Sequence, residues 1–222
     1  MRAIAIDGPA GAGKSSVARA VARRLGFIYI DTGAMYRAIA LKANRMGANL
    51  EDEDAMAALA YQSELRFRDN GAVILLDGED VSTAIRTPEI TGITKFAARA
   101  DGVRTELVRR QQEMARRQPV VMEGRDICTV VLKEARWKFF LTASAPERAR
   151  RRALEMRQAG HTVDESRILE EIKARDASDA QVGPMKQAME IAGAQNGDIH
   201  LLDTTDMNPE QVVDEIVSAV DE

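Results

Sequence analysis

The chain alternates short, continuous apolar runs with longer segments in which apolar residues recur every three or four positions. Runs of four or five apolar residues are typical of buried parallel strands, and the wider spacing is typical of amphipathic helices. Val17, Val21 and Leu25, for example, share one face of a predicted helix, and Gly26 follows its end. These patterns predict strands at residues 3–6, 27–30, 120–122, 137–141 and 199–202, and helices at residues 14–25, 35–47, 101–116, 144–160, 164–172 and 208–220.

A different pattern interrupts this alternation in the middle of the chain. Leu65 and Phe67 alternate with arginines, and a second apolar run follows after an Asp-Asn-Gly turn signal. Such spacing predicts a small antiparallel sheet whose strands are joined by tight turns. Because the earlier pattern resumes afterwards, we predict an α/β fold with a doubly wound parallel sheet. Residues 61–95 form an insertion within a single domain of residues 1–222.

A glycine-rich segment follows the first predicted strand and precedes the first predicted helix. It reads Gly8-Pro9-Ala10-Gly11-Ala12-Gly13-Lys14-Ser15-Ser16, which contains the P-loop pattern G-x-x-x-x-G-K-[ST]. The glycines allow backbone N–H groups to turn toward phosphate oxygens, and the start of the helix adds the positive end of its dipole. We predict that this segment binds ATP, with Lys14 at the β- and γ-phosphates and Ser15 as a ligand of Mg²⁺. A glycine-rich turn without a ligand is the alternative, which the position between strand and helix disfavours.

Other features separate the classes of P-loop protein. GTPases carry a guanine-reading Asn-Lys-x-Asp segment, which the sequence lacks, and helicase or transporter ATPases are usually longer chains with a strand that ends in Asp-Glu. Here the strand at 120–122 runs instead into Glu123, Gly124, Arg125 and Asp126. An arginine beside the end of a parallel strand indicates a second anionic ligand, which favours a kinase.

Composition narrows the range of partners. The 222 residues carry 31 Lys and Arg against 35 Asp and Glu, so the formal net charge of −4 lacks the basic excess that nucleic-acid binders usually show. The single cysteine, Cys128, allows no internal disulfide and fits a reducing compartment. The apolar run at the N-terminus is too short for a signal peptide or a membrane span. We expect a cytoplasmic monomer with small-molecule substrates, and with neither nucleic acid nor membrane as a partner.

Four segments together resemble bacterial cytidylate kinases, and the resemblance extends over nearly the whole chain. The segments are Ile6-Asp7-Gly8-Pro9-Ala10-Gly11-Ala12-Gly13-Lys14-Ser15-Ser16, Asp31-Thr32-Gly33-Ala34-Met35-Tyr36-Arg37, Gly124-Arg125-Asp126 and Glu171-Ile172-Lys173-Ala174-Arg175-Asp176. The resemblance implies a P-loop kinase core, a nucleotide-acceptor domain built on the insertion, and a mobile, arginine-rich helical lid at residues 148–180. The reaction that it implies converts ATP and CMP or dCMP into ADP and CDP or dCDP, with Mg²⁺.

The acceptor site is predicted at the ends of two strands, where ligands bind in doubly wound sheets. Arg37 is expected on the first turn of a helix, where its guanidinium can fork onto a phosphate. Arg125 suits the acceptor's phosphate, and Asp126 suits cytosine, because a carboxylate accepts a hydrogen bond from its exocyclic amine. A surface charge at Arg37 and a structural Arg125–Asp126 ion pair are the alternatives. By resemblance, the CMP site comprises Thr32, Tyr36, Arg37, Arg104 over the base, Arg125, Asp126, and Arg175 and Asp179 at the phosphate and ribose.

The predicted lid opens with a cluster of arginines. Arg148 and Arg152 share one helix face, and four arginines fall within residues 148–152. Like charges at this density repel one another unless an anion lies among them, and the triphosphate of ATP would supply it. The alternative is a solvated face paired with Glu147 and Glu155. We predict that the catalytic residues position the phosphates and neutralise charge without a general base; they are Lys14, Arg125, Arg148, Arg152 and Arg175.

Two positions depart from the family's pattern. Lys95 stands where the family commonly has a serine that contacts the base, and Val182 stands where it commonly has an arginine. We therefore predict a weaker preference for CMP over UMP than is usual in the family. Two other functions stay open: a P-loop kinase for another small acceptor such as UMP or shikimate, and a binding module in which ATP acts as a switch. The two histidines, His161 and His200, lack a second ligand at metal spacing, so neither predicts a metal site.

Overall fold

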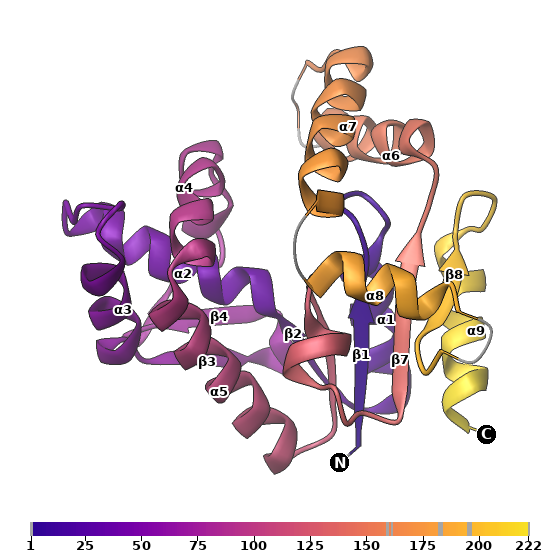
Figure 1. Cartoon of the computed structure of the whole chain (residues 1–222), viewed down its shortest axis with the longest axis horizontal. Coiled ribbons are helices and arrows are strands. Elements are labelled where there is room, and N and C mark those ends of the chain that lie inside the picture. Colours follow the sequence, from indigo (N-terminus) through magenta and orange to yellow (C-terminus); the bar gives the residue numbers. More distant parts are fainter. Residues whose placement is uncertain (1, 159, 161, 182–183, 195–196, 222) are drawn as a thin grey trace.

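The parallel sheet predicted from the sequence is confirmed in the computed structural model, which describes residues 2–158, 160, 162–181, 184–194 and 197–221 (Figure 1). In this described part, five parallel strands form one sheet in the order β2-β6-β1-β7-β8. The strands are β1 (Ala3–Asp7), β2 (Ile28–Asp31), β6 (Val120–Glu123), β7 (Trp137–Thr142) and β8 (His200–Asp203). All five residues of β1 are buried, as expected for the central strand of a sheet that is covered on both faces.

Helices cover the two faces of this sheet because side chains alternate along each strand. Ile4 and Ile6 of β1 face a hydrophobic cluster shared with α1 (Lys14–Leu25) and α9 (Pro209–Asp221). Ala3 and Ala5 face the opposite cluster, which includes residues of α8 (Pro184–Ala192) and of the π-helical turn Ile127–Val131. The layers on both sides make the fold doubly wound.

A small antiparallel sheet lies beside the parallel one, as predicted. Its strands are β3 (Leu65–Arg68), β4 (Val73–Leu76) and β5 (Glu79–Asp80), in that order. The first turn, Asp69–Gly71, has positive φ at all three residues, 51°, 54° and 88°. A Cβ on Gly71 would lie 1.8 Å from the carbonyl oxygen of Tyr29, so only glycine lets this turn pack against β2.

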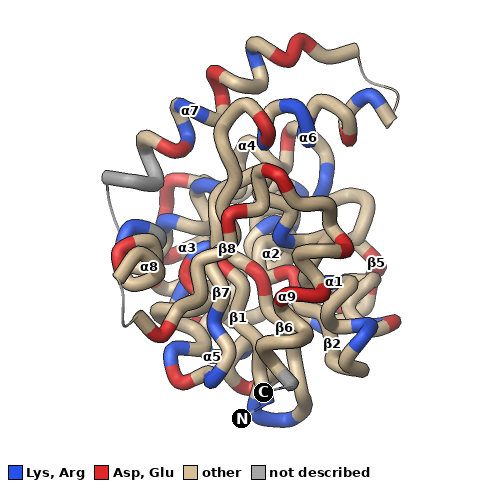
Figure 2. The backbone as a smooth tube through the Cα atoms, turned by 90° about the vertical axis from the view of Figure 1, so that its right-hand side faces the viewer, with Lys and Arg blue, Asp and Glu red and all other residues tan. Residues whose placement is uncertain are grey.

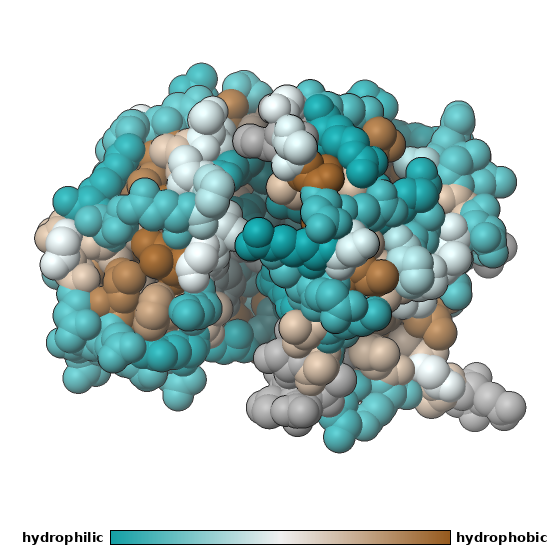
Figure 3. All heavy atoms as spheres, turned by 90° about the horizontal axis from the view of Figure 1, so that it is seen from above, coloured by the Kyte–Doolittle hydropathy of each residue, from teal (hydrophilic) through white to brown (hydrophobic). Residues whose placement is uncertain are grey.

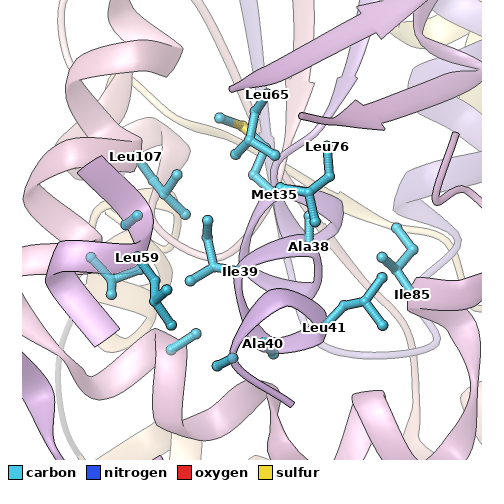
Figure 4. Close-up of a cluster of buried hydrophobic side chains, with 14 of the residues drawn as sticks. Met35, Ala38, Ile39, Ala40, Leu41, Leu59, Leu65, Leu76, Ile85 and Leu107 are labelled. Atoms are coloured by element: carbon cyan, nitrogen blue, oxygen red, sulfur yellow. The ribbon is translucent and has the colours of Figure 1, made fainter. Parts of the chain in front are cut away.

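Four helices pack with the small sheet around one hydrophobic cluster. They are α2 (Thr32–Arg45), α3 (Glu53–Gln62), α4 (Pro88–Arg99) and α5 (Asp101–Arg117), and the short η2 (Ala84–Arg86) precedes α4. Figure 4 shows side chains from α3, α5 and the strands converging on Met35, Ile39 and Leu41 of α2. We call these helices with the small sheet the acceptor unit. Residues 61–95 therefore share their core with α2, α3 and α5.

The sequence analysis missed α3 and α4, although both begin with a capping residue. Asp52 accepts a hydrogen bond from the backbone N–H of Ala55 (3.0 Å), and Thr87 accepts one from that of Ile90 (3.3 Å). Pro88 then occupies the first position of α4, where its missing N–H has no cost. α3 is rich in alanine, so its apolar stripe is weak and the period is hard to see.

Two further helices, α6 (Ala145–Gln158) and α7 (Glu165–Gln181), stand above the carboxyl end of the sheet (Figure 1). They share a separate cluster of Ala149, Ala153, Ile168 and Ile172. Ser144 caps α6, because its Oγ accepts a hydrogen bond from the backbone N–H of Glu147 (3.4 Å). The Glu147 side chain, however, pairs with Arg150 and Arg151 instead of completing a capping box. None of the helices described is both long and apolar enough to span a membrane.

Candidate active site

The P-loop occupies the carboxyl end of the central strand. A Cβ on Gly8 would lie 2.1 Å from the carbonyl oxygen of Leu141, so only glycine fits there. Lys14 is buried, and its Nζ donates to the carbonyl of Pro9 (2.9 Å). Burial lowers the pKa of Lys14 to about 8, and the nearby charges of Arg125 and Arg175 add to that effect. The predicted phosphate ligand is therefore a buried cation that a bound anion would stabilise.

Glu123, at the end of β6, contacts Ser15, the predicted magnesium ligand. Ser15 Oγ donates to Glu123 Oε1 (2.7 Å), and the Tyr29 hydroxyl lies 3.3 Å from the same oxygen. Burial raises the pKa of Glu123, and the charge of Lys14 opposes that shift. A hydroxyl beside a carboxylate is a set of hard oxygen donors that suits Mg²⁺. The sequence analysis gave Glu123 no role; an acidic residue at the end of a strand beside the P-loop strand was the available signal.

Arg37 lies on the second turn of α2, one turn later than predicted, because Asp31 caps the helix and α2 begins at Thr32. Its Nη2 is 2.9 Å from Asp31 Oδ2, and Arg86 Nη2 is 3.3 Å from the same oxygen. The Nε of Arg37 is buried without a hydrogen-bond partner among the described residues. Two arginines on one carboxylate leave a positive excess, and the unpaired N–H group can serve an anionic ligand.

The residues predicted to read the base gather from three elements. Arg104 Nη2 of α5 is 2.7 Å from Asp126 Oδ2, which follows β6. Burial and the Asp126 charge raise the pKa of Tyr36, on α2, to about 12. The ion pair of Asp126 thus involves Arg104, and Arg125 is close enough to Lys14 to alter its pKa. The alternative of a structural Arg125–Asp126 pair stays untested, and the ion pair recorded for Asp126 is the one with Arg104.

Thr32, the remaining predicted residue of this region, lies between the two strand ends. Its Oγ1 donates to the carbonyl of Glu123 (2.8 Å). A Cβ on Gly124 would lie 2.6 Å from that hydroxyl, so the close approach requires glycine there. Thr32 therefore ties the start of α2 to the end of β6.

Asp7 is a buried carboxylate that the sequence analysis did not single out. It accepts hydrogen bonds from the backbone N–H groups of Ile127 (3.0 Å) and Cys128 (2.8 Å). Burial raises its pKa to about 6, against the lowering effect of these bonds. Asp7 thereby holds the turn after Arg125 and Asp126 against the strand that carries the P-loop.

Protonation of Asp7 makes stability depend on pH. Its folded pKa of about 6 exceeds the usual 3.8, so the folded protein takes up this proton first. The contribution of this protonation to the free energy of unfolding is fully present below pH 3.8, and it is lost as the pH rises through 6. Relative to Asp7→Asn, the wild type is expected to lose about 3 kcal/mol of unfolding free energy between roughly pH 4 and pH 7. Urea unfolding of both proteins across this range measures the difference, and a flat difference contradicts the assignment.

The lid arginines are accompanied by carboxylates. Arg150 and Arg151 pair with Glu147, and Arg152 pairs with Glu155 (3.3 Å) on the surface. Figure 2 shows acidic and basic segments interspersed along α7. The repulsion expected among four arginines is therefore relieved within the protein, without an anion.

Arg148 and Arg151 differ from the other lid arginines because they contact the core. Arg148 is 5% exposed, and its Nη1 donates to the P-loop carbonyl of Ala10 (3.2 Å). Arg151 donates to Thr204 Oγ1 (3.0 Å), and a Cβ on Gly13 would lie 3.9 Å from its guanidinium. Arg151 had not been singled out, because neighbouring arginines are indistinguishable in the sequence.

Several predicted positions lie outside the described residues or away from the site. The Asp179 side chain, Val182 and His161 are outside the described part. His200 lies in β8 and stacks on Phe139, with ring centroids 5.4 Å apart. In the described part, no group of three or more His, Cys, Asp or Glu residues could hold a metal, so Mg²⁺ would also need phosphate oxygens.

The charges of Arg125 and Arg175 both act on Lys14, so these predicted site residues lie on the same side of the P-loop as its ammonium group. Seen from above, the molecular surface is hollowed between the acceptor unit and the part that carries α6 and α7, with largely hydrophilic walls (Figure 3). A cavity of about 840 Å³ lies elsewhere, between β3 and α5, and one of about 580 Å³ lies beside α1. The linings of both lack Lys14 and Arg125. That the lid of residues 148–180 covers this crevice stays a prediction.

Proteins similar to this chain include curated cytidylate kinases. Residues 4–222 match the family described as Cytidylate kinase. The cytidylate kinase of Desulforamulus reducens is 48% identical to this chain, and the alignment covers 99% of this chain and 97% of the relative. The cytidylate kinase of Bacillus cereus is 44% identical, with 98% of this chain and 95% of the relative covered. Among solved structures, TT1252 from Thermus thermophilus has a TM-score of 0.52 at 19% identity, covering 98% of this chain and 95% of its own. An uncharacterized protein from Eubacterium ventriosum has a TM-score of 0.53 at 12% identity, covering 100% and 99%. Identities this low support the fold alone.

Proposed function

The chain belongs to the cytidylate kinase family, and from this premise we propose that its open crevice passes the γ-phosphoryl group of ATP to CMP or dCMP. The enzyme is an ATP-dependent CMP kinase. One observation carries the placement of the site: Lys14 of the P-loop lies within electrostatic range of Arg125 and Arg175. Ligands for the donor and acceptor phosphates therefore share one space.

On the donor side, the P-loop segment from Gly8 to Ser16 holds the triphosphate. Lys14, whose pKa is lowered to about 8, regains its charge when phosphate oxygens surround it. Ser15 Oγ and Glu123 would hold Mg²⁺ directly or through water. When bound there, Mg²⁺ would supply positive charge to offset the negative charge that develops on the phosphates during transfer.

On the acceptor side, arginines hold the phosphate and a carboxylate reads the base. Arg37 supports this role with a buried, unpaired Nε, and Arg125 and Arg175 lie toward Lys14. Asp126 accepts from the exocyclic amine of cytosine while Arg104 holds its other side. Tyr36 and Thr32 line the same region, and Asp179 is assigned to the ribose by family resemblance.

The reaction needs no side chain as general base. The acceptor is a phosphate oxygen, which is largely ionised near neutral pH. Catalysis then consists of holding two phosphates in line and neutralising their charge with Lys14, Mg²⁺ and the arginines. When the lid closes over the crevice it excludes water and so suppresses ATP hydrolysis.

An ADP-release assay across CMP, dCMP, UMP, AMP and shikimate tests this function. Release that depends on CMP and dCMP, and is much weaker with the other three, is expected. Slow ATP hydrolysis that is independent of every acceptor would instead indicate a binding module that uses ATP as a switch. A cytoplasmic location and a monomeric state stay predictions.

Lys95 gives a test of base selectivity. It is exposed on α4, with its Nζ 5.1 Å from the centroid of the neighbouring Phe96 ring. A serine there would add one hydrogen bond to the base, worth about 1 kcal/mol. Lys95→Ser is therefore expected to raise the ratio of kcat/KM for CMP over UMP about fivefold. An unchanged ratio in steady-state kinetics would show that Lys95 does not govern selectivity.

A further inference from the structure

Arg148 is enclosed by the protein and has little left to offer a substrate. Its Nε donates to the carbonyl of Ala143 (2.8 Å), and its Nη1 donates to the carbonyl of Ala10 (3.2 Å). Nη1 and Nη2 also form a forked pair with the two carboxylate oxygens of Asp176, on α7. The guanidinium group has five N–H donors, and these four contacts leave few of them for another ligand. The residue is also 5% exposed. This arrangement does not suit a ligand of the triphosphate.

The backbone around Arg148 is also fixed to the P-loop. A Cβ on Gly11 would lie 3.0 Å from Arg148 Cβ and 3.2 Å from the Arg148 carbonyl oxygen. Gly11 has a φ of 79°, so a side chain there would also be strained. The P-loop and α6 therefore pack backbone to backbone at this point. Arg148 is a rigid anchor on the wall of the donor site.

Asp176 connects this anchor to a residue of the crevice. It follows Arg175 directly on α7, and successive helical residues point about 100° apart. Holding the Asp176 carboxylate on Arg148 fixes the rotation of α7 and hence the direction of Arg175. Arg175 is close enough to Lys14 to alter its pKa.

We infer that Arg148 is a positioning residue: with Asp176 it ties α7 to the P-loop and so aims Arg175 at the transferred phosphate. The inference rests on the proposed function. It reassigns Arg148, which the sequence placed among the catalytic arginines, leaves Arg152 for the triphosphate, and keeps Arg175 on the acceptor side, where the transferred phosphate arrives. Arg152 is far more accessible than Arg148, because 56% of its side chain is exposed against 6% for Arg148.

A double-mutant cycle with Arg148→Met and Asp176→Ala tests the inference. Each variant misaims Arg175, so each is expected to lower kcat about 10²-fold, with a smaller change in the KM for ATP. Both substitutions break the same link, so kcat of the double variant is expected to be no lower than kcat of the more impaired single variant. Arg148→Lys, which cannot fork onto a carboxylate, is expected to give no rescue. Arg150→Ala is the matched control, because Arg150 is an exposed neighbour that pairs with Glu147 on its own helix, and this variant should keep wild-type kinetics.

Multiplicative losses, or a much larger loss for Arg148→Met than for Asp176→Ala, would overturn the inference in favour of direct contact with ATP. Amide hydrogen exchange of residues 165–181 without nucleotide is a second readout. Exchange should rise in both single variants and stay unchanged in Arg150→Ala. Because exchange needs no turnover, unaltered exchange rejects the anchor even if the wild type lacks CMP kinase activity. Asp176 is 32% exposed, so its variant remains informative if Arg148→Met fails to fold.

Discussion

Replacing Lys14 by alanine is expected to lower kcat by about 10³-fold while the fold stays intact. The ammonium group donates to the P-loop carbonyl of Pro9, and the charges of Glu123, Arg125 and Arg175 act on it. In the proposed reaction it lies beside the phosphate oxygens on which charge builds up. Burial lowers its pKa to about 8, so the folded protein without nucleotide gains little from holding this charge. The interaction becomes favourable once phosphate oxygens arrive. It therefore contributes to turnover far more than to folding.

The measurement compares kcat at saturating CMP with the unfolding free energy from urea titration. Lys138 is a matched control, because it is also a buried lysine, 5% exposed, but it bonds to Lys133 and Asp198 outside the crevice. Lys138→Ala should reduce stability and leave kcat nearly unchanged, the reverse of Lys14→Ala. A Lys14→Ala enzyme with kcat within tenfold of wild type would remove Lys14 from the chemistry.

Features encoded by local pattern could be predicted from the sequence. The strands of the main sheet are continuous apolar runs, and the P-loop is fixed by glycines at short spacing. The turn at 69–71 was also predictable, because Asp, Asn and Gly tolerate the positive φ that it requires. Each of these signals lies within about ten residues of the structure it determines.

Contacts across long stretches of chain could not be predicted in the same way. Asp7 meets the backbone of Ile127 and Cys128, and Glu123 meets Ser15, more than one hundred residues away in each case. Nothing near Asp7 or Glu123 in sequence marks these partners. They become neighbours only because β1 and β6 are adjacent in the sheet.

The lid arginines show why composition misleads about individual roles. The sequence presents Arg148, Arg150, Arg151 and Arg152 as one charged cluster, but a helix turns each to a different environment. Arg148 reaches α7 and the P-loop, whereas Arg152 pairs with Glu155 on the surface. Two arginines of the same charge therefore have different roles: Arg148 holds α7 to the P-loop, and Arg152 forms a solvent-exposed ion pair.

Asp126→Ala is expected to lower kcat/KM for CMP by about 10²- to 10³-fold and to abolish the preference for CMP over UMP. Asp126 is 8% exposed. A bound base that offers its carboxylate no hydrogen-bond donor therefore binds more weakly, because the carboxylate loses water without gaining a partner. Cytosine supplies the donor with its exocyclic amine, whereas uracil presents an acceptor oxygen at the same position. Discrimination therefore comes mostly from the rejection of uracil.

The variant also frees Arg104, which is held 2.7 Å from Asp126 in the wild type. An unpaired guanidinium donates to the acceptor oxygen of uracil, so kcat/KM for UMP should rise as that for CMP falls. Steady-state kinetics with both nucleotides measures the two changes, and Glu79→Ala is the control, because its exposed pair with Arg45 lies in the same unit. A simple structural defect would lower both values together. Opposite changes therefore separate base reading by Asp126 from its packing, and a CMP preference that survives in Asp126→Ala would assign base reading to other residues.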